Sequence, residues 1–165
     1  MNEHLRRLLL ATLLIIIQTT VIEYLSVMGI KPDILLIFIV YIAITKGQIT
    51  GTIYGFIIGF IFDLVSGGVL GISSLCKTIA GFVSGYFYNE NKIGLTLSSY
   101  RFLLILILIS FLHNIIYFLI FLQGSEVDIL SAILKLGLTT TLYTSAVSIF
   151  IVLFSTRKYT SKING

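Results

Sequence analysis

The sequence has little charge, a single proline, a single cysteine and no tryptophan. Only 11% of its 165 residues are charged and 57% are hydrophobic, whereas a soluble domain needs about 25% charged residues to keep its surface hydrated. Its 11 Lys and Arg residues and 7 Asp and Glu residues are too few to cover a globule of this length. The composition therefore excludes a soluble, disordered or fibrous protein and predicts a polytopic membrane protein.

The motifs of common enzyme chemistry are also missing. Cys76 has no second cysteine with which to form a disulfide, and it cannot build a metal site alone. The two histidines, His4 and His113, lie on different predicted elements, and no cluster has metal-ligand spacing. The sequence contains no phosphate-binding Gly-x-x-x-x-Gly-Lys-Ser/Thr loop, no Gly-x-Ser-x-Gly elbow and no basic run with interleaved aromatics. We therefore predict no enzyme activity, no cofactor, no metal and no nucleic-acid binding.

Apolar segments predict an all-α integral membrane protein with six transmembrane helices and short loops, forming one domain over residues 1–165. The predicted spans are Leu8–Met28, Asp33–Thr45, Ile49–Val65, Ser73–Tyr88, Arg101–Leu122 and Ser131–Phe154. The second span is short, because a helix of this length rises only about 20 Å across a hydrocarbon core of about 30 Å. This segment is expected to extend, to tilt or to be partly re-entrant. Five full spans with one short span are therefore the alternative topology.

The distribution of charge predicts the orientation. With six spans and a cytoplasmic N-terminus, eight of the 11 cations lie on the inner side, as the positive-inside rule requires. These are Arg6, Arg7, Lys46, Lys92, Arg101, Arg157, Lys158 and Lys162. A five-span topology would place the C-terminal cations outside. We therefore predict that both termini are cytoplasmic.

The strongest local pattern is a series of glycines in the third span. Gly51, Gly55 and Gly59 recur every four residues and share one helix face, and Gly81 and Gly85 repeat this spacing in the fourth span. Helices in lipid associate through close packing at small residues. Packing of the chain's own helices is the favoured interpretation, and docking of another protein's helix is the alternative.

Two charged residues lie within the third and fourth spans. Asp63 is near the outer end of the third span, and Lys77 follows the start of the fourth by about a turn and a half. Because a charge inside the bilayer is costly, we hypothesise an Asp63–Lys77 ion pair that closes this hairpin. In the alternative, Asp63 caps a helix or faces water while Lys77 extends toward the interface.

Polar side chains also occur at mid-membrane depth in the first, fifth and sixth spans. They are Gln18, Thr19, Ser110, His113, Asn114, Thr139, Thr140, Thr141 and Thr144. Hydrogen bonding within the packed bundle is the favoured interpretation, and a ligand or ion pathway is the alternative. Toward the outer surface, Glu23, His113, Asn114 and Lys135 form a candidate polar pocket.

The stretch from Lys31 to Tyr86 combines these features in a recognisable order. It contains Pro32-Asp33 at a helix start, Lys46-Gly47, the series Gly51, Gly55, Gly59 and Asp63, the loop Ser66-Gly67-Gly68-x-x-Gly71, and Gly81-x-x-x-Gly85-Tyr86. Together these motifs resemble the rod shape-determining protein MreD family of bacteria. The resemblance covers about a third of the chain.

The resemblance implies a non-catalytic scaffold in the complex that elongates rod-shaped cells. MreD-like proteins work with MreC, the MreB filament, RodA and a class B penicillin-binding protein, which insert lateral-wall peptidoglycan, and MreC is the expected direct partner. The resemblance also implies location in the bacterial cytoplasmic membrane and a fold similar to the substrate-binding subunits of energy-coupling-factor transporters. It implies no catalytic residue.

The alternative function is a vitamin-binding subunit of an energy-coupling-factor transporter. The helix count and the outer polar pocket would suit it. Such subunits typically present an Ala-x-x-x-Ala face on their first helix, whereas the first span here has only Ala11. A handler of lipid-linked precursors or a small channel is a third class, which nothing among the polar residues requires. A channel should show a continuous polar stripe on several spans, whereas the polar residues here are scattered.

Overall fold

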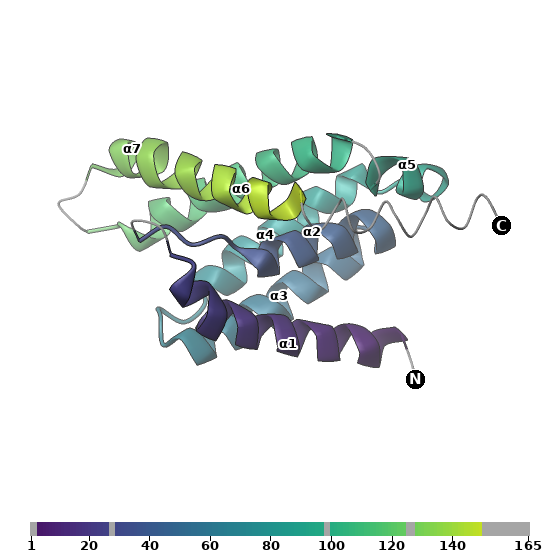
Figure 1. Cartoon of the computed structure of the whole chain (residues 1–165), viewed down its shortest axis with the longest axis horizontal. Helices are drawn as coiled ribbons and strands as arrows, with labels where there is room; N and C mark the ends of the chain where they lie inside the picture. The colour runs from purple at the N-terminus through teal and green to yellow at the C-terminus, as the bar shows by residue number, and fades with distance from the viewer. Residues whose placement is uncertain (1–2, 27–28, 98–99, 125–127, 150–165) are drawn as a thin grey trace.

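The computed structural model describes residues 3–26, 29–97, 100–124 and 128–149, and its elements there are helices (Figure 1). The main helices are α1 (Glu3–Tyr24), α2 (Ile34–Lys46), α3 (Gln48–Ser66), α4 (Ile72–Ser84) and α6 (Tyr100–Phe121). Shorter elements are the 3-10 turns η1 (Gly85–Phe87) and η2 (Glu90–Lys92), then α5 (Ile93–Leu97), α7 (Ile129–Ala132) and the π-helical turn η3 (Ile133–Gly137). The last two elements begin one continuous helix, Ile129–Ile149.

All six predicted segments contain a helix, and within the described ranges four helices are long and apolar enough to cross a membrane. These four stretches are Leu5–Ile22, Gln48–Ser66, Tyr100–Phe121 and Ile129–Ile149. The other two helices, α2 and α4, have 13 residues each. Residues 27–28 of the first predicted span and 150–154 of the sixth lie outside the described part of the chain. Six spans therefore stay a prediction.

The short helix α2 is buried on nearly all sides. It lies between α1 and α6 in the bundle (Figure 1), and a helix that is apolar all round is typical of a buried position. One face packs on α6 through Leu36, Val40 and Ile44, and another packs on α1 and α3 through Leu35, Ile39 and Ile42. Protein neighbours surround α2, so it does not have to match the thickness of the lipid.

The glycine face of α3 lies directly against α4. A Cβ atom added at Gly55 would collide with the backbone carbonyl of Lys77, and one added at Gly59 would lie 2.6 Å from Cα of Ser74. Gly51 faces Gly81 in the same way. The helix face for which partner docking was the alternative is therefore occupied by this chain's own α4.

Close approach of the two backbones continues to the far end of the hairpin. Gly85 lies against the backbone of Gln48. The side-chain amide of Gln48 donates to the carbonyl of Phe82 over 3.2 Å, and near the other end the Ser74 hydroxyl donates to the carbonyl of Phe56 over 3.3 Å. The hairpin is thus fixed by small residues along its length and by hydrogen bonds near its two ends.

We predict that Gly55→Ala destabilises the protein by about 1–3 kcal/mol, because the new methyl group meets backbone that cannot move aside. Unfolding can be followed by the reaction of a maleimide dye with Cys76, which is fully buried and is the single cysteine of the chain. The matched control is Gly68→Ala, since a Cβ at Gly68 meets only the Ser66 hydroxyl at 3.6 Å. Equal unfolding temperatures for the two variants would contradict the packing argument.

Candidate functional site

The N-terminus of α2 is buried in the bundle and carries an ion pair. Asp33 caps α2, with its Oδ1 atom accepting the N–H of Leu36 at 2.9 Å. Its Oδ2 atom accepts from Nζ of Lys77 on α4 at 2.6 Å, and the ammonium group also lies 5.3 Å from the centre of the Phe62 ring. The Lys77 side chain is only 3% exposed. The predicted Asp63–Lys77 pair is therefore wrong: Lys77 pairs with Asp33.

Two other helices satisfy the backbone around this cap. Gln18 of α1 donates from its amide to the carbonyl of Pro32 and accepts the N–H of Ile34, both over 3.0 Å. The hydroxyl of Thr144, in the last helix, accepts the N–H of Asp33 at 3.1 Å. The first N–H groups of a helix have no partner within the helix, and lipid supplies none. Side chains from the neighbouring helices therefore hold the start of α2.

Asp63 holds the start of α4 in a similar way. Its buried carboxylate accepts three backbone N–H groups, from Gly71 at 2.9 Å, Ser73 at 3.2 Å and Ser74 at 3.0 Å. Negative charge is favourable at a helix N-terminus, and the N-cap residue Gly71 has no side chain of its own to offer. Asp63 therefore needs no lysine, and the alternative prediction for it, helix capping, describes the structure.

The glycine-rich loop gives Asp63 access to these amides. Gly67 ends α3 in the left-handed region (φ 67°), and Gly71 precedes α4 in the same region (φ 94°). Residues other than glycine rarely adopt these angles. The loop, which also includes the exposed residue Ser66, returns the chain so that α4 begins over the Asp63 carboxylate.

A second polar group joins α6 to the last helix. The amide of Asn114 donates to the carbonyl of Gly137 at 3.2 Å and to the hydroxyl of Thr141 at 3.0 Å. The adjacent residue, His113, is only 6% exposed, yet neither of its ring nitrogens has a hydrogen-bond partner among the described residues. Its ring stacks on Tyr117, with 6.4 Å between the ring centres.

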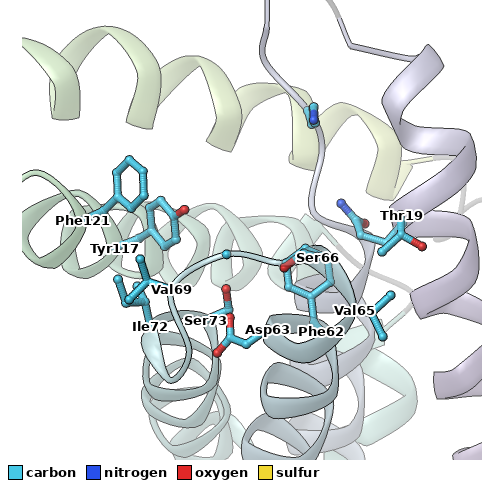
Figure 2. A pocket seen from close by; sticks show the side chains of 13 residues that line it. Thr19, Phe62, Asp63, Val65, Ser66, Val69, Ile72, Ser73, Tyr117 and Phe121 are labelled. Atoms are coloured by element: carbon cyan, nitrogen blue, oxygen red, sulfur yellow. Dashed lines mark hydrogen bonds between the residues drawn. The ribbon is translucent and has the colours of Figure 1, made fainter.

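Two cavities lie where these polar groups meet. One has a volume of about 390 Å³ and is lined by Gln18, Gly29, Ile30, Lys31, Asp33, Phe62, Ser73, Lys77, His113, Asn114, Tyr117, Phe118, Leu136 and Thr140. The other, of about 450 Å³, lies over the loop between α3 and α4, with Tyr117 and Phe121 facing Thr19 across it (Figure 2). Both are lined by Gln18, Lys31, Phe62, Ser73 and Tyr117. We name them the polar cavity and the loop cavity.

The predicted polar pocket is only partly the one observed. His113 and Asn114 line the polar cavity, whereas Lys135 is exposed and lines neither cavity. The side chain of Glu23 lies outside the described part of the structure. Sequence reasoning missed Tyr117, although it follows His113 by four residues and so shares its helix face.

The chemistry of the site is that of hydrogen bonding. An ion pair, an imidazole, an amide and a phenol converge on the polar cavity from α2, α4 and α6. Across residues 3–149, apart from the undescribed positions, no three His, Cys, Asp or Glu side chains are grouped so that they could hold a metal ion. The arrangement is suited to recognition of a polar group.

The chain matches a known protein-family model. The model described as "rod shape-determining protein MreD" matches residues 2–162, which is nearly the whole chain. Searches of the curated proteins and of the solved structures found no match.

We predict that Lys77→Met alone destabilises the protein by about 3–5 kcal/mol, because it leaves the Asp33 carboxylate unpaired in the bundle. Asp33→Asn combined with Lys77→Met should recover at least half of that loss, since asparagine still caps α2. The matched control combines Lys77→Met with Asp63→Asn, which should not recover stability. The measurement is thermal unfolding followed at Cys76, and rescue by the Asp63 substitution instead would reverse the assignment of the pair.

Proposed function

Because the chain belongs to the MreD family of rod shape-determining proteins, we propose that it is a non-catalytic scaffold of the bacterial elongation complex. It binds MreC and helps to position lateral-wall peptidoglycan synthesis, and in this way it maintains cell shape. The observation that carries this proposal is the family match over residues 2–162. The proposed complex also contains MreB, RodA and a class B penicillin-binding protein.

The proposed location is the cytoplasmic membrane, with six spans and both termini in the cytoplasm. Four helices in the described part of the chain have the length and apolar character of spans, and α2 and α4 are proposed to complete the bundle as short spans surrounded or flanked by protein. The positive-inside rule supports this orientation. It places the loop between α3 and α4, and the two cavities beside it, toward the outer surface.

The orientation predicts opposite accessibility for two loops. In a Cys76→Ala background, a single cysteine at Gly68, in the loop between α3 and α4, should react with a membrane-impermeant maleimide in intact cells. A single cysteine at Asn91, an exposed residue of η2, should react only after the membrane is permeabilised. The reverse pattern would invert the topology.

MreC is proposed to meet this chain within the bilayer, because the chain has little mass outside its helices. The face of α3 that points away from α4 is apolar and exposed, and it includes Phe56 (54% exposed) and Phe60 (43% exposed). Their rings stack, with 6.0 Å between the centres. Aromatic side chains are enriched at protein interfaces. We therefore assign the MreC helix to this face of α3 and not to its glycine face.

The family match supports the scaffold and gives no support to the alternative of a vitamin-transporter subunit. Similarity of the fold to such subunits stays an expectation from the family. The same holds for the direct contact with MreC.

We predict that MreC copurifies with the tagged protein from native membranes in a mild detergent, as identified by mass spectrometry. Phe56→Ala combined with Phe60→Ala should lower the recovery of MreC by about tenfold, which corresponds to about 1.4 kcal/mol. The control is Leu9→Ala combined with Leu13→Ala on the exposed face of α1, which should leave recovery unchanged. Absence of MreC from the wild-type sample would refute the scaffold, and equal recovery from both double variants would refute the assigned face.

A further inference from the structure

The proposed scaffold role makes no use of the polar cavity. Its volume of about 390 Å³ lies within the range of small-molecule sites, about 300–1,000 Å³. It is lined by residues from α1, α3, α4, α6 and the last helix, and by the segment that leads into α2, so its walls are helices and not loops alone. This cavity carries an inference that goes beyond partner binding and does not depend on it.

Hydrogen-bond donors on one side of the cavity exceed the acceptors available to them. Lys77 has three N–H donors, but among the described residues only Asp33 accepts a hydrogen bond from it. His113 lines the same cavity, and within the part of the chain that the structure describes neither of its buried ring nitrogens has a partner. Burying polar groups without partners is unfavourable. An oxyanion entering the cavity would accept from both side chains.

The cavity also offers an acceptor. The Asp33 side chain is 18% exposed, against 3% for Lys77, so a ligand meets the carboxylate as well as the ammonium group. The Asp33–Lys77 pair is neutral as a unit. Lys31 carries the one further charge in the lining, and this residue is exposed. A ligand with one net charge would leave that charge unbalanced at the buried pair. A net-neutral ligand that carries both an oxyanion and an ammonium group keeps the balance.

The surroundings of the cavity indicate that this ligand has an apolar part. The loop cavity, which shares five lining residues with the polar cavity, adds the apolar side chains Val65, Val69, Ile72 and Phe121, several of which are labelled in Figure 2. Both cavities therefore place apolar side chains beside polar groups, a lining that fits an amphiphile. The π-helical turn η3 contributes Leu136 to the wall, and such turns occur frequently at functional sites.

We propose that the polar cavity binds the headgroup of a phospholipid with a phosphate and a primary ammonium group, the chemistry of phosphatidylethanolamine. The phosphate accepts hydrogen bonds from Lys77 and His113, and the ammonium group donates to Asp33. These charge-assisted hydrogen bonds are stronger than neutral ones. A quaternary ammonium group has no N–H to donate, so the site discriminates against phosphatidylcholine.

The test uses the full chain, purified and delipidated in detergent, with thermal unfolding followed at Cys76. Short-chain phosphatidylethanolamine, phosphatidylcholine and phosphatidylglycerol are added separately, and glycerophosphoethanolamine provides the headgroup without acyl chains. The expected apparent affinity for phosphatidylethanolamine is about tenfold higher than that for either other lipid. Equal stabilisation by all three lipids would overturn the proposal. If glycerophosphoethanolamine competes fully with phosphatidylethanolamine, the ligand is a free headgroup compound and the proposed lipid is wrong.

Variants assign the preference to the cavity. His113→Phe keeps an aromatic ring beside Tyr117 but removes both ring nitrogens, and it should abolish the preference for phosphatidylethanolamine. Thr140→Leu, which narrows the same cavity, provides a second test if the first variant folds poorly. Thr20→Val, at an exposed position on α1, is the control and should keep the preference. Retention of the preference in both cavity variants would place lipid binding elsewhere and refute the site.

Discussion

The arrangement of this protein depends on how the buried start of α2 is satisfied. A 13-residue helix that begins inside the bundle has first N–H groups without partners in the helix, and lipid cannot bond them. Gln18, Thr144 and Lys77 reach this point from three other helices. The requirement for these partners fixes α1, α4 and the last helix around α2.

The glycine hairpin makes this convergence geometrically possible. With no side chains between them, α3 and α4 approach until their backbones touch at Gly55 and Gly59. This contact brings the start of α4 over Asp63 and leaves Lys77 directed at Asp33. The two carboxylates therefore act alike: each stabilises a helix N-terminus, and one of them also neutralises the buried lysine.

The groups that hold the helices together also line the polar cavity. Gln18, Asp33, Lys77 and Asn114 each make structural hydrogen bonds and each face this space, whereas His113 faces it with no hydrogen-bond partner among the described residues. A rod shape-determining membrane protein of this family thus combines apolar outer faces, suited to lipid or to the helix of a partner, with an inner polar chamber suited to a headgroup. The two surfaces are separate, so partner binding and ligand binding can be tested independently.

The sequence by itself determined the membrane class, the positions of the helices and the family. Low charge and apolar segments are local properties, and the spacing of Gly51, Gly55 and Gly59 is enough to define a helix face. The partner of Lys77 was decided only by the tertiary structure, because Asp33 and Asp63 both lie at the ends of predicted spans, and position in the sequence does not identify which carboxylate is free. Asp63 is occupied by three backbone amides, and that becomes evident only once the loop has folded back. His113 and Tyr117 of α6 line the same cavity as Asp33 and Lys77. This arrangement likewise follows from packing between helices distant in sequence, which no local pattern encodes.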